Sequence, residues 1–574
     1  MMKKFLAVLL TAAMVFGTIS LTGCESATEH DISLAEAADE AFAKEMTETL
    51  AFDESLNDPD TLFRGAGSDA EHATADYIAQ QFESIGLQEV TKDKVTVDGW
   101  QTGESYMKIG DLDIEDLVPY QATGTHAPDG TAYPVSIRDL NQWGDGDTER
   151  EVEDADWSKM DIVDVGTGTA EEYEDVDVEG KIVLVAVNQW TEYWIDSPYT
   201  EAFYRGAAAV ISYQYDEDGA GYGMYDLIDN AENCDTINVQ DICEKDLIPC
   251  GSISPKDAAA IQAKMKEDDT NTLSGVDLKL TCEVKKDTTA YNVLGKIPGT
   301  ADTGQRILIG GHYDKYHGGV NDDCTAVALA TSIGKALIDS NYQPKNDIYI
   351  VAHCAEEWGR SGAADDWAMG SWEEITEVHP EWQGSTLAFI NFEMPAIKSG
   401  QKKGQIQTSY EFNTMLQKLL DSDALNASYY EEGVEIVNDH NMGMSDCISY
   451  QEKGVPVIIN KPDFDKPKKG EVSSSGSWMM DRYHTKYDDM STYSSQLMTY
   501  DIVLYGTIAE YIDSQPALEL DLTARCDALE AMIDGVEEYL PEENVDLVKE
   551  YKDSLAAMRS AGAAQLKKAQ DLNA

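Results

Sequence analysis

Short apolar runs alternate with helical stretches from residue 291 onward, and this alternation constrains the fold more than any other feature. Four of the runs carry almost no polar residue except at their ends: 306–309, 347–352, 386–391 and 455–460. Strands that are apolar along their whole length are typical of parallel sheets covered by helices on both faces. The sequence therefore predicts an α/β fold with a mostly parallel mixed sheet sandwiched by helices.

Histidine and acidic residues follow several of these runs directly. They are His312 and Asp314, then Asn321, Asp322 and Asp323, then Glu356 and Glu357, then Glu393, and late in the chain Tyr483 and His484. Ligands of parallel sheets bind at the carboxyl ends of the strands, where such side chains meet. Imidazole and carboxylate groups are common zinc ligands. We therefore expect a metal centre at this edge of the sheet.

The order of these motifs carries a family resemblance. GGHYD, NDD, AEEWGRSG, INFEM and YHT begin at residues 310, 321, 355, 390 and 483. In this order they resemble the di-zinc exopeptidase family that contains bacterial aminopeptidases, aminopeptidase Y and glutamate carboxypeptidase. The resemblance implies the zinc exopeptidase fold, peptide substrates and two Zn²⁺ ions, with other divalent metals as an alternative.

The same resemblance implies a set of metal ligands. His312, Asp322 and Glu393 would bind one zinc, and Asp322, Glu357 and His484 the other, so that Asp322 bridges the pair. A bridging carboxylate suits two metal ions about 3.5 Å apart. The family usually has Asp at the position of Glu393, and the longer side chain brings the affinity of one metal into question.

Further roles follow from the resemblance. Glu356 would act as general base, Asp314 would hold the second N–H of His312, and Tyr483 would donate to the oxyanion. Asp446 and Arg360 are expected on the substrate side. The peptide bond between residues 322 and 323 is expected to be cis, as it often is in this family.

The texture of the sequence divides the chain into five parts. A helical stretch is expected at 202–209 and a strand at 210–214, and the segments 177–185 and 206–211 make the third part resemble a β-rich protease-associated domain. The predicted parts are a signal peptide (1–23), an acidic tether and helix (24–60), a protease-associated insertion (119–287), a catalytic domain on either side of it (61–118 and 288–515) and a C-terminal helical hairpin (516–574).

The first residues resemble a bacterial lipoprotein signal. Two lysines precede an apolar run at 5–17 that is short for a membrane span, and Leu-Thr-Gly-Cys ends at Cys24. We expect cleavage before Cys24, lipidation of its thiol and attachment to the extracytoplasmic face of the cell membrane through this lipid alone. An ordinary secreted protein with an unmodified Cys24 is the alternative.

The net charge limits the classes of molecule that the protein can bind, and the cysteines raise the question of disulfide bonds. The 574 residues carry a net charge of −65, which opposes binding to nucleic acids and to anionic lipid head groups. Eight cysteines follow Cys24, and their pairing is open, since an exported chain permits disulfides. Cys324 and Cys354 lie in apolar surroundings that also suit buried thiols.

Three functions are compatible with these features. The first is a lipid-anchored zinc aminopeptidase that releases N-terminal residues. The second is a carboxypeptidase of the glutamate carboxypeptidase kind, which requires cationic groups for a free carboxylate; Arg360 and Arg482 are the nearest in sequence. The third is a receptor-like surface lipoprotein without catalysis, which predicts missing ligands. The sequence leaves side-chain specificity and oligomeric state open.

Overall fold

The computed structural model describes most of the chain. The residues described are 32–573, apart from 123, 127–128, 133–134, 139–148, 153–154, 188–194, 215–247, 361–366, 399–400, 423–427, 439–444, 463–477, 479–481, 537–538 and 542–543. Cys24 and the predicted signal peptide therefore lie outside the described residues.

The centre of the molecule is the predicted sheet. The strand β11 (Arg306–His312) lies between β12 (Asp347–His353) and β13 (Thr386–Asn391), parallel to both, and β16 (Val457–Asn460) pairs parallel with β13. Every residue of β11 except Arg306 is buried, which is why the strand is apolar between Arg306 and the terminal His312. The fold prediction is confirmed, with strand bounds within three residues of those expected.

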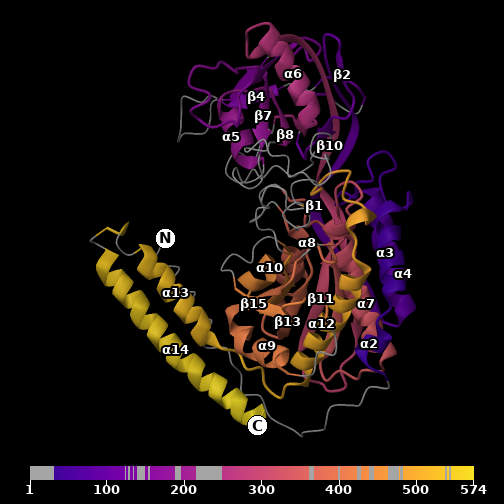
Figure 1. The fold of residues 1–574 in the computed structure, drawn as a ribbon, viewed down its shortest axis with the longest axis vertical. Coiled ribbons are helices and arrows are strands. Elements are labelled where there is room, and N and C mark those ends of the chain that lie inside the picture. The colour runs from indigo at the N-terminus through magenta and orange to yellow at the C-terminus, as the bar shows by residue number, and fades with distance from the viewer. Residues whose placement is uncertain are drawn as a thin grey trace.

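Helices cover both faces of this sheet (Figure 1). The helices α7 (Thr325–Asp339) and α12 (Ser495–Ser514) pack on one face, and α8 (Met369–Glu373) and α10 (Cys447–Glu452) pack on the other. α7 is buried on nearly all sides, because α3 (Glu40–Phe52) and α12 also pack against it. Two further strands extend the sheet beyond β16, with one helix beside them: β14 (Gly404–Thr408), β15 (Val434–Val437) and α9 (Asn413–Leu420).

Two long strands connect this body to a second lobe. β1 (Gln88–Ile109) and β10 (Thr272–Ile297) pair antiparallel along almost their whole length and continue into the upper lobe (Figure 1). β10 pairs with β12 near its end and with β6 (Met160–Asp164) near its beginning. The described strands thus form one 14-stranded sheet shared by both lobes, beside a separate pair of strands.

The upper lobe contains a parallel layer of strands. β6 is followed by β7 (Ile182–Val187), β8 (Ala209–Gln214) and β9 (Cys250–Ser252), with α5 (Asp196–Tyr204) and α6 (Pro255–Glu267) packed on them. The helix predicted at 202–209 is wrong: α5 ends at residue 204, because Gly206 turns the chain with a φ of 82° into β8. The small strands of this lobe are β2 (Leu112–Ile114), β3 (Val118–Pro119), β4 (Val135–Arg138) and β5 (Glu149–Val152).

The two ends of the described chain are helical. Near the N-terminus α2 (Leu34–Ala37), α3 (Glu40–Phe52) and α4 (Asp69–Ile85) pack on the α7 side of the body. α4 ends at Gly86, which adopts the left-handed conformation expected of a C-cap.

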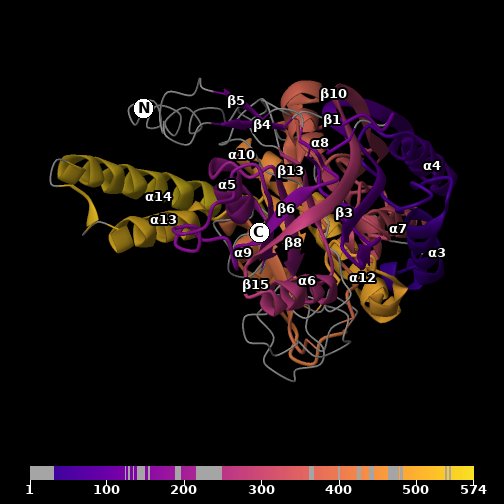
Figure 2. The same cartoon turned by 90° about the horizontal axis from the view of Figure 1, so that it is seen from above.

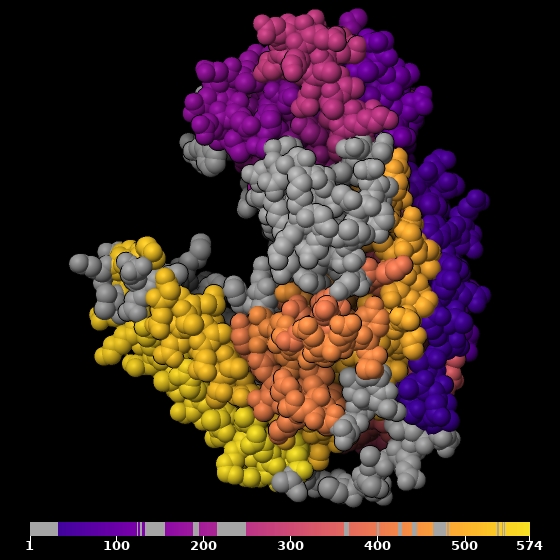
Figure 3. Space-filling model, viewed as in Figure 1, coloured from indigo at the N-terminus to yellow at the C-terminus, as the bar shows by residue number. Residues whose placement is uncertain are grey.

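At the other end α13 (Leu522–Val536) and α14 (Val545–Asn573) lie side by side and extend away from the body (Figure 2). On the face seen in Figure 3 they stand apart from the upper lobe.

The described residues can be checked for disulfide bonds and for membrane-spanning helices. Cys324 and Cys354 are buried thiols, as their surroundings suggest, and the six cysteines that the structure describes form no disulfide with one another. Within the described residues, no helix is both long and apolar enough to cross a membrane.

Two buried cations fix the N-terminal segment to the strand that carries His312. Arg64 donates hydrogen bonds to the carbonyl oxygens of Tyr313 (2.6 Å) and Leu56 (3.2 Å), and Lys315 donates to that of Leu62 (2.6 Å). Both side chains are fully buried, and burial together with the charge of Arg64 lowers the pKa of Lys315 to about 7. The loop after β11 is therefore held on one side by the protein's own N-terminal segment.

Candidate metal centre

The carboxyl ends of three neighbouring strands bring the predicted ligands together. His312 ends β11, Glu356 and Glu357 follow β12, and Glu393 follows β13. Asp322 lies in the turn between β11 and α7, and His484 comes from the loop before α12. All of these side chains are buried.

The carboxylate of Asp322 faces both histidines. Its Oδ1 lies 3.4 Å from Nε2 of His312, and its Oδ2 lies 3.3 Å from Nε2 of His484. The peptide bond that follows Asp322 is cis, as predicted. One carboxylate thus points one oxygen at each imidazole, which is the arrangement that a bridging ligand requires.

The other predicted ligands lie on either side of this carboxylate. Oε1 of Glu357 is 3.0 Å from Nε2 of His484, and Oε1 of Glu393 is 3.7 Å from Nε2 of His312. Both ligand sets predicted from the sequence therefore converge in space. Asp323, which the sequence did not assign, also contributes, since its Oδ2 lies 3.6 Å from Nε2 of His312.

Two positions beside these ligands and one ligand itself have an uncommon backbone conformation. Ala355, Met394 and His484 have φ values of 55°, 46° and 56°, in the left-handed region that residues other than glycine rarely adopt. Such conformations cluster at functional sites, where the surrounding structure enforces them. Here they aim Glu356, Glu393 and His484 toward the same space.

Asp314 supports two of the ligand-bearing segments. Its Oδ1 and Oδ2 accept hydrogen bonds from the backbone N–H groups of Glu356 (3.1 Å) and Glu357 (2.9 Å). Nδ1 of His312 lies 3.0 Å from the Asp314 carbonyl oxygen and 3.5 Å from its carboxylate. The shorter contact of Asp314 with His312 is therefore made by its backbone carbonyl oxygen. Its carboxylate mainly holds the loop after β12.

Two further residues support the site, and the sequence assigned a role to neither of them. The carboxylate of Asp488 accepts hydrogen bonds from the backbone N–H groups of Asn321 (3.0 and 3.1 Å) and Asp322 (3.0 Å). The Asn460 side chain accepts from the backbone N–H of Glu393 (2.9 Å) and donates to its carbonyl (2.7 Å). Asn460 thereby fixes the backbone that carries the longer Glu393 side chain.

Charge and burial in this cluster favour bound cations. Five buried carboxyl groups, those of Asp322, Asp323, Glu356, Glu357 and Glu393, surround two imidazoles. Burial raises the pKa of Glu357 to about 8, whereas burial of Asp322 is outweighed by the two imidazoles, which hold its pKa low. Nε2 of His312, Oδ2 of Asp323 and Oε2 of Glu393 are buried and make no hydrogen bond to the described residues. These donors fit zinc, which takes nitrogen and carboxylate ligands.

Aromatic rings form one wall of the centre. Tyr483 stacks on His484 with ring centroids 3.6 Å apart, and Tyr316 packs on the same imidazole at 4.6 Å. Tyr316 in turn contacts Trp358, and Trp358 contacts Trp100. The wall restricts the orientation of His484 and places the predicted oxyanion donor Tyr483 directly beside a predicted ligand.

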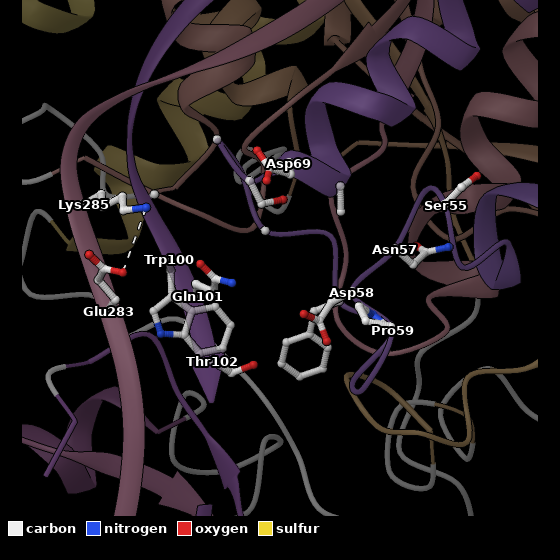
Figure 4. A pocket seen from close by; sticks show the side chains of 16 residues that line it. Ser55, Asn57, Asp58, Pro59, Asp69, Trp100, Gln101, Thr102, Glu283 and Lys285 are labelled. Atoms are coloured by element: carbon white, nitrogen blue, oxygen red, sulfur yellow. Dashed lines mark ion pairs between the residues drawn. The ribbon is translucent and has the colours of Figure 1, made fainter. Parts of the chain in front are cut away.

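A cavity of about 380 Å³ lies next to this wall, where β1 passes between the lobes (Figure 4). It shares Phe63 and Trp100 with the aromatic contacts, and its rim carries Asp58, Asp69 and the pair of Glu283 and Lys285. None of the predicted metal ligands lines it. The cavity is therefore a neighbour of the metal centre and not a part of it.

The predicted substrate-side residues are already engaged by other groups. Asp446 is fully buried, with Oδ2 3.2 Å from Nδ1 of His353. The guanidinium of Arg360 lies 3.3 Å from both Asp287 and Glu373. The structure therefore places neither residue as an exposed, uncommitted group, and their roles toward a substrate stay predictions.

We expect replacement of Asp488 by asparagine to weaken metal binding by about 10- to 100-fold, the usual effect of removing a group that orients a ligand. The amide removes the negative charge that faces the two successive N–H groups and places an NH₂ donor where one carboxylate oxygen now accepts from Asn321. Competition with a chelator measures the apparent Kd. The exposed Asp302→Asn variant is the control, and equal affinities in the two variants would contradict a role for Asp488.

A sheet edge that gathers two histidines and several buried carboxylates defines a metallohydrolase type of site. Residues 292–504 match the model for Peptidase family M28. This part of the chain, which holds all the predicted ligands, is therefore a Peptidase family M28 domain, and the family predicted from the motifs is confirmed.

Solved structures show the same fold at low sequence identity. A Peptidase M28 precursor from Shewanella amazonensis has a TM-score of 0.61 at 19% identity, covering 84% of this chain and 96% of that one. A zinc aminopeptidase from Bacillus subtilis has a TM-score of 0.55 at 16% identity, covering 85% and 98%. An aminopeptidase from Aneurinibacillus sp. strain AM-1 has a TM-score of 0.51 at 18% identity, covering 83% and 94%.

One curated relative matches over a shorter region. The mouse protein Aminopeptidase NAALADL1 is 30% identical over 121 residues. The match spans 20% of this chain and only 15% of the relative.

Proposed function

We propose that this protein is a zinc exopeptidase that removes amino acids from the N-terminus of peptides. The observation that carries the proposal is the Asp322 carboxylate, which directs one oxygen at His312 and the other at His484. A carboxylate in this position fits a pair of divalent ions bound side by side. The matched peptidase family, the zinc aminopeptidase from Bacillus subtilis and the aminopeptidase from Aneurinibacillus support the reaction class.

The residues present would hold two ions. His312 and Glu393 would bind one, Glu357 and His484 the other, and Asp322 both. The chemistry that such a pair supplies when bound is polarisation of the scissile carbonyl and activation of a water molecule. Every other step falls to side chains of this protein.

Glu356 is the proposed general base. It follows β12 directly before the ligand Glu357, and its backbone is fixed by Asp314. Its carboxylate would take the proton of the attacking water and pass it to the leaving amine. Burial raises the pKa of Glu356 well above its ordinary value, and the nearby carboxylates of Glu393 and Glu357 add to this, although His312 opposes it. Bound cations would favour the ionised form that a base needs.

Tyr483 is the proposed oxyanion donor. Its ring is stacked on His484, so that its position is coupled to that of a ligand. A phenolic O–H placed beside the scissile carbonyl would stabilise the negative charge that develops on the oxygen. Asp314 would act indirectly, by holding the segment that carries both Glu356 and Glu357.

Charge favours an amino-terminal over a carboxy-terminal specificity. Arg360 pairs with Asp287 and Glu373, and Arg482 donates to the carbonyl of Tyr487 and to Asp489. These are the two arginines nearest to the metal-ligand motifs in the sequence, and both are already paired with acidic or carbonyl groups of the protein. A buried cluster rich in carboxyl groups instead suits the ammonium group of a peptide N-terminus.

An end-blocking panel tests the proposal. We expect the protein loaded with zinc to release the first residue of peptides with a free N-terminus and an amidated C-terminus. Acetylation of the N-terminus and removal of metal with EDTA should each abolish hydrolysis. Cleavage of N-acetylated peptides from a free C-terminus would establish the carboxypeptidase alternative. Absence of hydrolysis with less than one zinc per chain would overturn the proposal and favour the receptor-like alternative.

Lipid attachment at Cys24 and an extracytoplasmic location stay predictions from the N-terminal sequence.

A further inference from the structure

A second cluster of metal-ligating side chains lies away from the centre described above and shares no residue with it. Asp93 belongs to β1, Glu374 begins the short helical segment η4 (Glu374–Val378), and His379 follows that segment directly. One potential ligand atom from each of the three lies within 4.8 Å of the other two. Asp93 and His379 are 286 residues apart in the chain.

The distances suit one small cation. Nε2 of His379 lies 3.1 Å from Oδ2 of Asp93 and 3.7 Å from Oε1 of Glu374. Ligand atoms about 2.0–2.2 Å from a tetrahedral zinc ion are separated by similar distances. The Glu374 side chain is fully buried, whereas those of Asp93 and His379 are 18% and 29% exposed, which leaves the cluster open on one side.

The imidazole is held in the orientation that a metal ligand needs. Nδ1 of His379 lies 2.9 Å from Oε1 of Glu381, and the ring stacks on Trp382 at 4.2 Å with an angle of 5° between the planes. A carboxylate on one ring nitrogen favours the tautomer whose other nitrogen can bind a metal. The nitrogen that remains, Nε2, is the one that faces Asp93 and Glu374.

One carboxylate oxygen of Glu374 is held by a hydrogen bond, and the other makes no hydrogen bond to the described residues. Its Oε2 accepts a hydrogen bond from the side-chain amide of Asn292 (2.8 Å). Its Oε1 is buried, makes no hydrogen bond to the described residues and points into the cluster. A buried carboxylate oxygen without a hydrogen bond is costly unless a cation compensates it.

From this geometry we infer a further binding site for a divalent transition-metal ion such as Zn²⁺, formed by Asp93, Glu374 and His379. A nitrogen and two carboxylate oxygens are donors that zinc accepts, with water at the open side. The ion would tie η4 to β1. Through Asn292, which also accepts from the backbone N–H of Cys354, it would stabilise the segment that leads to Glu356.

Metal counting on the full-length protein tests this site. The protein is stripped with a chelator, reloaded with Zn²⁺ and analysed for bound metal by mass spectrometry. We expect His379→Gln and Asp93→Asn each to bind one equivalent less than the wild type. Glu377→Gln, an exposed change in the same segment, should bind as many as the wild type. The Asp93 variant keeps the test decisive where the His379 variant fails to fold.

A second variant separates this site from the proposed catalytic centre. Asp322→Asn, which disables that centre, should still bind one Zn²⁺, and added Zn²⁺ should raise its midpoint of thermal unfolding. Adding His379→Gln to this variant should remove both effects. Equal metal content in the wild type and the His379 and Asp93 variants would overturn the proposal and leave an imidazolium paired with carboxylates. Peptidase activity is not the measurement for this site, because disabling the other centre alone would also abolish activity.

Discussion

Replacement of Glu356 by glutamine is expected to lower kcat for peptide hydrolysis by about 10²- to 10⁴-fold, the range that a general base contributes. Glutamine has nearly the same shape but cannot accept a proton. Zinc content should stay equal to that of the wild type, because Glu356 is not among the proposed ligands. KM should change little, since the loss concerns proton transfer and not substrate binding.

Two comparisons make this result specific. Glu377→Gln removes an exposed carboxylate and should leave kcat unchanged. Glu357→Gln, at the next position, should lose zinc together with activity, because Glu357 contacts His484. An active Glu356→Gln protein, or one that has lost its zinc, would show that neighbouring carboxylates have been assigned the wrong roles.

The ligands could be predicted from the sequence because each follows a local pattern. His312, Glu357 and Glu393 come within a few residues of an apolar strand, and neighbouring parallel strands end at the same edge of the sheet. The strand positions alone therefore brought these three side chains together. His484 lies in a loop, and only its place in the family's motif order connected it to the others.

The supporting residues could not be predicted because their roles depend on contacts between distant segments. Asp488 holds the backbone of Asp322 across 166 residues, and Asn460 holds that of Glu393 across 67. Asn460 has no sequence pattern that distinguishes it from an ordinary polar loop residue, and the place of Asp488 four residues after His484 does not show which backbone it holds. The cluster of Asp93, Glu374 and His379 likewise exists only because β1 lies beside the segment after α8.

The division between the lobes also depends on structure. β1 and β10 run through both lobes, and the irregularities in their pairing lie at Gln88/Thr91, Val97/Gly99 and Thr102/Ser105. Bulges of this kind change the twist of a pair of strands without ending it. Domain boundaries predicted from turn residues assume that strands end between domains. Because β1 and β10 continue from one lobe into the other, the two lobes share one sheet.

Replacement of Asp322 by asparagine is expected to lower kcat/KM by more than about 100-fold, beyond the effect of removing a group that only orients a ligand. An amide offers one oxygen, so it cannot direct an acceptor at both His312 and His484. The variant should therefore lose the two ions of the centre together and not one at a time. Zinc titration by calorimetry checks this, with Asp302→Asn as a control that should bind like the wild type. Retention of both ions at wild-type affinity would contradict the bridge, because ligands that bind each ion separately would then be sufficient.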